Sequence, residues 1–167
     1  MGKVLVAFYS SAGTTRKAGQ AIAAALGADF EDIREVKPRH LDVRGPGGLG
    51  KFMGILLAGA EAGMGRSTPI LPSQYNPADY DLVVIGTPIW NARLAGPVRA
   101  YIGRHRNQFK SVAFFRTALD SRPSLRCFRQ MEEACGRAPR AATNLDADKV
   151  NGGDAAAQVQ EFVSKLA

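Results

Sequence analysis

The sequence predicts an α/β protein built on a parallel sheet of five strands. Strand-like apolar runs alternate with helix-like segments along the chain, and there is no internal repeat. The clearest runs, at residues 4–9, 81–86 and 111–115, are apolar on both faces, which is typical of strands buried between two helical layers. Because a turn and a helical pattern follow each of these runs, the chain has the order of successive strand–helix–strand units.

Length and composition fit one folded domain over residues 1–167. With 46% hydrophobic residues, the chain can bury a core without disulfides or metals. The first residues lead straight into a strand and contain no secretory signal. The most apolar segment, residues 52–64, is too short and too interrupted to cross a bilayer. We therefore expect a cytoplasmic protein with no membrane span.

In the first half of the chain, we expect a helix at residues 14–26, because apolar residues recur there at helical spacing and Gly27 follows. Residues 29–33 have the mixed polarity of an edge strand. Glycines and prolines make the next forty residues harder to interpret, although residues 51–62 fit a helix. The glycine-rich stretch 45–72 suits either a contact in a homo-oligomer or a lid.

In the second half, the strand at 81–86 runs into a loop at 87–91, because Pro88 cannot continue a hydrogen-bonded ladder. Pro97 then lies in the first turn of a helix. A second loop at 116–121 leads into a helix at 123–135.

The C-terminal part consists of a weak strand at 140–145 and an amphipathic helix after Gly153. The residues expected on the buried face of this last helix are Ala156, Val159, Phe162, Val163 and Leu166.

Residues 10–15 have the composition of an anion-binding turn. Hydroxyl residues surround one glycine directly after the first strand and before a helix. Such a turn points backbone N–H groups at one spot, with the positive end of the helix dipole behind them. Helix capping alone also accounts for Ser and Thr here. In open α/β sheets, however, ligands bind beyond the carboxyl ends of the strands, where strand order 2-1-3-4-5 brings together the loops at 10–15, 87–93 and 116–121.

Two segments resemble the flavodoxin family. Residues 8–18 (FYSSAGTTRKA) are similar to the flavodoxin phosphate loop. Residues 86–90 (GTPIW), followed by AGPV at 95–98, are similar to the loop that flanks the flavin ring. Their order and spacing agree, and the resemblance covers residues 3–166. It implies a three-layer flavodoxin-like fold, with a five-stranded parallel sheet in order 2-1-3-4-5, and FMN as the cofactor.

The resemblance also implies which residues bind FMN. Backbone amides of residues 11–15, with the hydroxyls of Ser10, Thr14 and Thr15, would hold the phosphate. Trp90 would stack on the ring, although ordinary packing is its alternative role. The amides of residues 87–91 and 117–120 would bond the polar edge of the ring. The implied cofactor-binding residues are Ser10, Ser11, Ala12, Gly13, Thr14, Thr15, Thr87, Pro88, Ile89, Trp90, Asn91, Thr117, Ala118, Leu119 and Asp120. No catalytic residue and no metal ligand is assigned.

Three departures from the family bear on function. Ala12 stands where the phosphate loop usually has Thr, and the third loop has no aromatic residue, which leaves one ring face open. The chain is basic, with a net charge of +7, whereas flavodoxins that carry single electrons are usually acidic. These features favour an oxidoreductase that passes electrons from NAD(P)H to a quinone-like acceptor. Two alternatives stay open: an electron carrier reduced by a separate partner protein, and an interaction module without a cofactor.

The remaining patterns exclude several other classes. Between Arg93 and Arg140 there are eleven Lys or Arg against three acidic residues, but no recognition helix or aromatic-basic motif favours nucleic acid. His40 and His105 lack metal-ligand spacing, and His105 is expected at a solvated helix end. The two cysteines are expected to be buried or half-buried thiols. No Gly-x-Ser-x-Gly elbow provides a hydrolase nucleophile.

Overall fold

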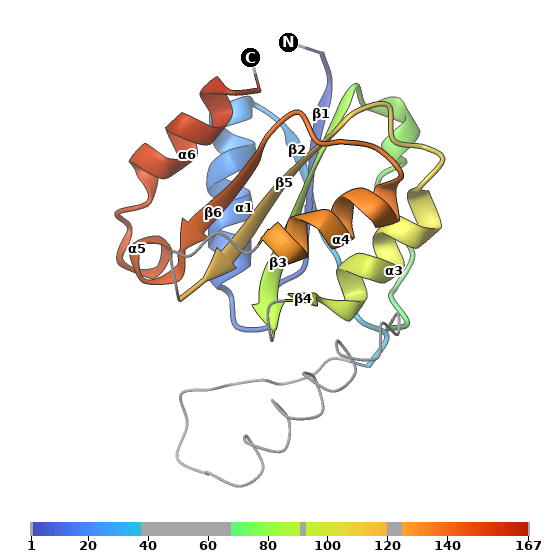
Figure 1. The fold of residues 1–167 in the computed structure, drawn as a ribbon, viewed down its shortest axis with the longest axis horizontal. Coiled ribbons are helices and arrows are strands. Elements are labelled where there is room, and N and C mark those ends of the chain that lie inside the picture. Colours follow the sequence, from blue (N-terminus) through green and yellow to red (C-terminus); the bar gives the residue numbers. More distant parts are fainter. Residues whose placement is uncertain (1, 38–67, 91–92, 120–124, 167) are drawn as a thin grey trace, which may run out of the picture.

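The computed structural model describes residues 2–37, 68–90, 93–119 and 125–166. Its sheet has the strand order β2-β1-β3-β5-β6, all parallel, with the short β4 paired antiparallel to β3 (Figure 1). Counted without β4, this is the predicted order 2-1-3-4-5, and β2 lies at an edge as expected. The strands are β1 (Val4–Phe8), β2 (Asp29–Asp32), β3 (Leu82–Trp90), β4 (Arg93–Leu94), β5 (Val112–Ala118) and β6 (Ala142–Asp146).

Helices cover both faces of the sheet, so the three-layer α/β prediction is confirmed (Figure 1). α1 and α6 pack on one face, with α5 beside α1, and α3 and α4 pack together on the other. The helices are α1 (Thr14–Leu26), the 3-10 helix η1 (Pro77–Asp79), α3 (Gly96–His105), α4 (Leu125–Cys135), α5 (Ala147–Gly152) and α6 (Ala156–Ser164).

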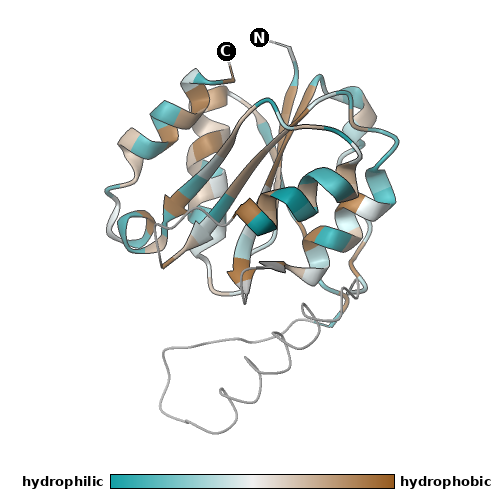
Figure 2. Cartoon of the chain, viewed as in Figure 1, coloured by the Kyte–Doolittle hydropathy of each residue, from teal (hydrophilic) through white to brown (hydrophobic). Residues whose placement is uncertain are grey.

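Side chains of the central strands alternate between two cores. In β5, Val112 and Phe114 face α3 and α4, whereas Ala113 and Phe115 face α1 and α6. All four are fully buried. Because both faces of these strands are covered, residues 112–115 are continuously apolar. Much of the central strands is brown, the hydrophobic colour, in Figure 2.

β3 continues through Pro88 to Trp90, where the sequence analysis expected a loop. The carbonyl of Gly86 accepts a hydrogen bond from the Tyr9 amide at 3.3 Å, so the backbone groups of Gly86 point toward β1. Those of Pro88, two residues further, point to the same side, where β1 has already ended. Proline therefore removes no bond from the ladder, and Pro88 lies level with Thr117 of β5.

β5 also extends beyond its predicted end at Phe115, because β6 pairs with it as far as Asp146. Arg116, Thr117 and Ala118 are therefore strand residues and not the start of a loop. Arg116 was expected at the start of a loop, yet it is only 2% exposed.

Several smaller expectations need correction. Ala156 was expected on the buried face of the last helix, but it is exposed, whereas Ala155 is buried. α5 was not expected; its N-cap is Asp146, whose side chain accepts hydrogen bonds from two amides of the first turn. Both cysteines are buried and free, as expected. The predicted helix at 51–62 lies outside the described residues, as does His40.

His105 is buried, with 8% exposure, although it was expected at a solvated helix end. Its ring packs against Tyr101, with the centroids 4.7 Å apart, and the segment before η1 covers it. In the part of the chain that the structure describes, no helix combines the length and the apolar character needed to cross a membrane.

Candidate functional site

The turn between β1 and α1 lies at the carboxyl edge of the sheet. Gly13 caps the helix in a left-handed conformation, with φ of 91°. Nothing lies within 4 Å of the position that a Cβ on Gly13 would take. A side chain would strain this backbone, so glycine lets the chain turn sharply from strand into helix and leaves the space in front of the helix open.

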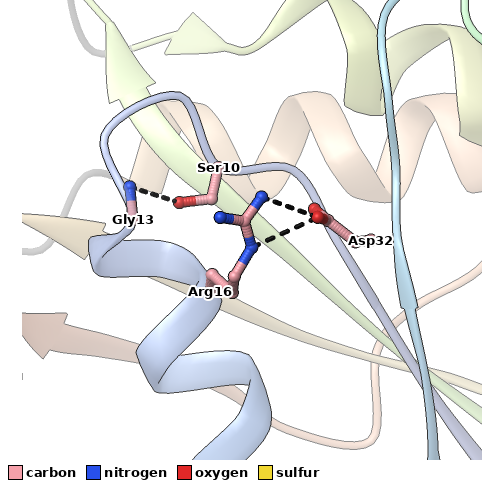
Figure 3. A network of polar contacts seen from close by, with 4 residues as sticks. All are labelled: Ser10, Gly13, Arg16 and Asp32. Carbon is pink, nitrogen blue, oxygen red and sulfur yellow. Dashed lines mark hydrogen bonds and ion pairs between the residues drawn. The ribbon is translucent and has the colours of Figure 1, made fainter. Parts of the chain in front are cut away.

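Inside this turn, the Gly13 amide donates a hydrogen bond to Ser10 Oγ at 3.1 Å (Figure 3). The Lys17 amide donates to the Gly13 carbonyl, which makes this the first bond of the helix. The amides of Thr14, Thr15 and Arg16 precede that bond, so they have no acceptor within the helix. The turn thus presents three backbone donors and the positive end of the helix dipole.

The first turn of α1 contains no acidic residue that could serve these donors. Arg16 is directed to β2 instead, where its guanidinium donates to Asp32 Oδ2 at 2.7 Å (Figure 3). The two side chains are 46% and 25% exposed, so this ion pair stabilises the fold only weakly. Its main effect here is to pair the carboxylate of Asp32 with a cation.

The threonine hydroxyls at the start of α1 bind other parts of the chain. Thr15 Oγ1 lies 2.7 Å from Thr117 Oγ1 of β5, and both side chains are buried. Thr14 Oγ1 donates to Asn151 Oδ1 of α5 at 3.1 Å. These contacts join segments more than 100 residues apart in the sequence, and they hold the α1 terminus beside the end of β5.

The second expected segment, at residues 87–91, is strand up to Trp90. Thr87 is fully buried, and its hydroxyl accepts a hydrogen bond from the Ala95 amide at 3.4 Å. Ile89 pairs with Leu94, and Trp90 with Arg93, so β3 and β4 form a hairpin at this edge. Asn91 lies outside the described residues, and stacking by the Trp90 side chain stays a prediction.

The third expected segment, at residues 117–120, begins within β5. Thr117 and Ala118 pair with Leu145 and Asp146 of β6. Leu119 follows the strand with 78% of its side chain exposed. Asp120 is beyond the described part of the chain.

The register therefore brings the three segments to one edge of the sheet. Pro88 lies level with Thr117, whose hydroxyl meets Thr15 of the turn at 10–15. Of the expected site residues that the structure describes, Ser10, Ser11, Ala12 and Gly13 lie in the turn itself, and Thr14 and Thr15 lie in the first turn of α1.

Arg116 is a residue of this edge that the sequence analysis did not select. Its buried guanidinium brings positive charge close to Cys127 of α4. Burial raises the pKa of the Cys127 thiol to about 12, and Arg116 lowers it by a smaller amount. The thiol is therefore protonated and unreactive near neutral pH. A charged residue two positions after Phe114 carries no sequence signal of burial, so pattern alone could not have identified Arg116.

The Thr15–Thr117 contact leads to a prediction about stability. Replacing either residue by Val leaves the other hydroxyl buried without its partner, so each single variant should lose about 1–3 kcal/mol of unfolding free energy. The double variant T15V/T117V should lose clearly less than the sum of the two. Urea denaturation of the four proteins measures the coupling. T143V, at a half-buried position in β6, is the control and should change stability by no more than about 0.5 kcal/mol. Strictly additive losses would show that the two hydroxyls do not interact.

Neither a family model nor a curated protein matches this sequence. Several solved structures do match its fold. A flavoprotein from Lactobacillus acidophilus NCFM, solved in complex with FMN, is 19% identical with a TM-score of 0.69, over 91% of this chain and 98% of that one. An apo NADH:FMN oxidoreductase is 16% identical with a TM-score of 0.51, over 98% of this chain and 89% of that one.

A third match is the flavodoxin, WrbA-like protein of Agrobacterium tumefaciens, at 11% identity and a TM-score of 0.50, over 97% of this chain and 99% of that one. At these identities the likeness is one of fold. Together with the strand order β2-β1-β3-β5-β6 and its two helical layers, it shows that the chain has the flavodoxin-like fold.

Proposed function

We propose that this protein binds FMN and is an oxidoreductase that passes electrons from NAD(P)H to a quinone-like acceptor. The observation that carries the proposal is the open turn at residues 10–15, followed at the carboxyl edge of the sheet by the first-turn amides of α1, which have no acceptor within the helix. The structural match solved in complex with FMN supports the choice of cofactor. The match to an NADH:FMN oxidoreductase supports the choice of donor.

The turn fits a phosphate group through its backbone. The hydroxyls of Ser10, Thr14 and Thr15 each already have a partner in the protein. The amides of Thr14, Thr15 and Arg16 would therefore be the main phosphate donors, with Ser11 and Ala12 forming the wall of the turn. Because the backbone supplies the donors, alanine at position 12 removes a hydroxyl and leaves the site otherwise complete.

The flavin ring would lie beyond the ends of β3 and β5. Bound FMN supplies the capacity to accept two electrons from a nicotinamide and to pass them to an acceptor. Residues 87–90 and 117–119 would orient the ring and exclude water from one side of it. Thr117, Ala118 and Leu119 include no aromatic residue, which supports an accessible ring face for the donor and the acceptor.

The charge of the protein supports an anionic donor. The net charge is +7, and exposed arginines lie on the α3–α4 side of the sheet, among them Arg126 and Arg129 of α4. Much of the α4 ribbon is coloured teal, the hydrophilic end of the scale, in Figure 2. NAD(P)H carries phosphate groups, so this charge would raise its rate of encounter at low salt.

Gly13 provides a test of the phosphate site with a matched control. Gly13 and Gly27 cap opposite ends of α1, both have positive φ, and both have open space at the Cβ position. G13A and G27A should therefore each lose about 1–2 kcal/mol of stability from backbone strain. Only G13A should weaken FMN binding, by about tenfold or more, because it distorts the donor turn. Fluorescence titration with FMN measures the affinity of each variant. Equal affinity in G13A and G27A would place the phosphate elsewhere.

The oxidoreductase proposal predicts reduction by a nicotinamide alone. The FMN-loaded protein should lose its flavin absorbance when NADH or NADPH is added without oxygen, and a quinone should restore it. The rate should fall as salt rises, because screening weakens the attraction of the arginines for the donor. If neither nicotinamide bleaches the flavin but a separate reductase does, the protein is an electron carrier. If FMN does not bind, the interaction module is favoured.

A further inference from the structure

A second pocket, remote from the candidate FMN site, lies at the C-terminal end of α3. It has a volume of about 590 Å³ and lies between the segment at 70–76 and the end of the helix. Ala95, directly before α3, contacts Thr87 of the candidate FMN site, whereas His105 is the last residue of α3 and lines this pocket. A helix of ten residues is about 15 Å long, so the two sites are separate.

Three side chains of this pocket form a hydrogen-bonded chain. Ser73 Oγ lies 2.7 Å from His105 Nε2, and His105 Nδ1 lies 2.5 Å from Gln108 Oε1. The amide oxygen of Gln108 can only accept, so His105 Nδ1 carries the proton. In the neutral ring, Nε2 is then the acceptor, and the hydroxyl of Ser73 donates to it. This is the tautomer that a histidine needs to act as a general base toward a serine.

The surrounding structure fixes the positions of these three hydrogen-bonded side chains. His105 is buried and packs on the ring of Tyr101. The two residues after Ser73 are fixed by Glu31, a buried carboxylate that accepts the amides of Gln74 at 2.8 Å and Tyr75 at 3.2 Å. Ser73 itself is half-buried and lines the pocket. A serine that is fixed, paired with an oriented histidine and open to a cavity meets the geometric requirements of a nucleophile.

Arg104 adds positive charge to the same pocket. Its guanidinium donates to the carbonyls of Leu71 at 2.8 Å and Ile70 at 3.1 Å. These two bonds fix the position of the group and leave further N–H donors on it. A fixed cation beside a nucleophile stabilises the negative charge that develops on a carbonyl oxygen under attack.

We propose that Ser73 is a nucleophile activated by His105 and that the pocket hydrolyses small carboxylic esters. Ser73 Oγ attacks the ester carbonyl carbon while its proton moves to His105 Nε2. The bond to the alkoxy group breaks, and the alkoxy oxygen leaves as an alcohol with that proton. Water then attacks the acyl-serine, His105 takes a proton from it and returns it to Ser73, and the carboxylic acid is released. No redox step and no cofactor is involved.

Gln108 acts as a positioning residue. It orients His105, but as a neutral amide it stabilises the imidazolium less than a carboxylate would, because hydrogen bonds between charged groups are about twice as strong. We therefore expect slow turnover, and we expect the variant Q108E to be faster than the parent protein.

Covalent labelling tests this proposal. The full chain is incubated with a fluorophosphonate, and the adduct is located by peptide mass spectrometry. We expect one adduct, on Ser73, and slow hydrolysis of p-nitrophenyl acetate. S73A should abolish both, and S111A, at another half-buried serine, should change neither. Q108E should raise the labelling rate about fivefold or more. Gln108 is exposed, so this variant retains the fold, and circular dichroism checks this.

Absence of an adduct on Ser73, equal ester hydrolysis in S73A, or an unchanged labelling rate in Q108E would each overturn the proposal. A hydrogen bond that only secures the end of α3 would give such results. FMN affinity of S73A is measured in parallel and should equal that of the parent protein. The outcome here is therefore independent of whether FMN binds.

Discussion

The left-handed backbone at Gly13 is the constraint on which the candidate site depends. It allows β1 to pass into α1 within a few residues, so that the helix begins at the carboxyl edge of the sheet. Its first-turn amides and its dipole then face the space beyond the strands. The hydrogen bond between Thr15 and Thr117 ties this terminus to β5, and the bond from Thr14 to Asn151 ties it to α5. The turn thus faces the space beyond the strands, and hydrogen bonds to β5 and α5 fix the helix that follows it.

The fold could be predicted because its strongest signals are local. A strand covered on both faces is expected to be apolar on both, and β1 and the first halves of β3 and β5 are. The bounds of α1 followed from apolar periodicity and from Gly27 at its end. Strand ends were predicted less well because they depend on neighbours far away in the sequence. Pro88 is tolerated in β3 because β1 has ended beside it, and β5 reaches Ala118 because β6 lies alongside.

The sites, too, could be predicted where their signals are local and not where they depend on residues far away in the sequence. The turn at residues 10–15 could be found because all its donors are consecutive. Thr15 and Thr14, whose hydroxyls the sequence analysis assigned to the phosphate, also contact β5 and α5, more than 100 residues away, and no local pattern reveals such pairs. The sequence analysis did not identify the Ser73–His105 pair for the same reason, since the two residues are 32 positions apart and match no motif. The buried Arg116 likewise became evident only with the β5–β6 register.

The central claim is that the backbone amides at the start of α1 bind the phosphate of FMN. The most direct test is to titrate the protein with FMN and with riboflavin, which has the same ring and lacks the phosphate. The phosphate contacts predict that FMN binds about 100-fold more tightly or better, equivalent to about 2.7 kcal/mol. Equal affinities for the two flavins, or no binding of either, would contradict the account.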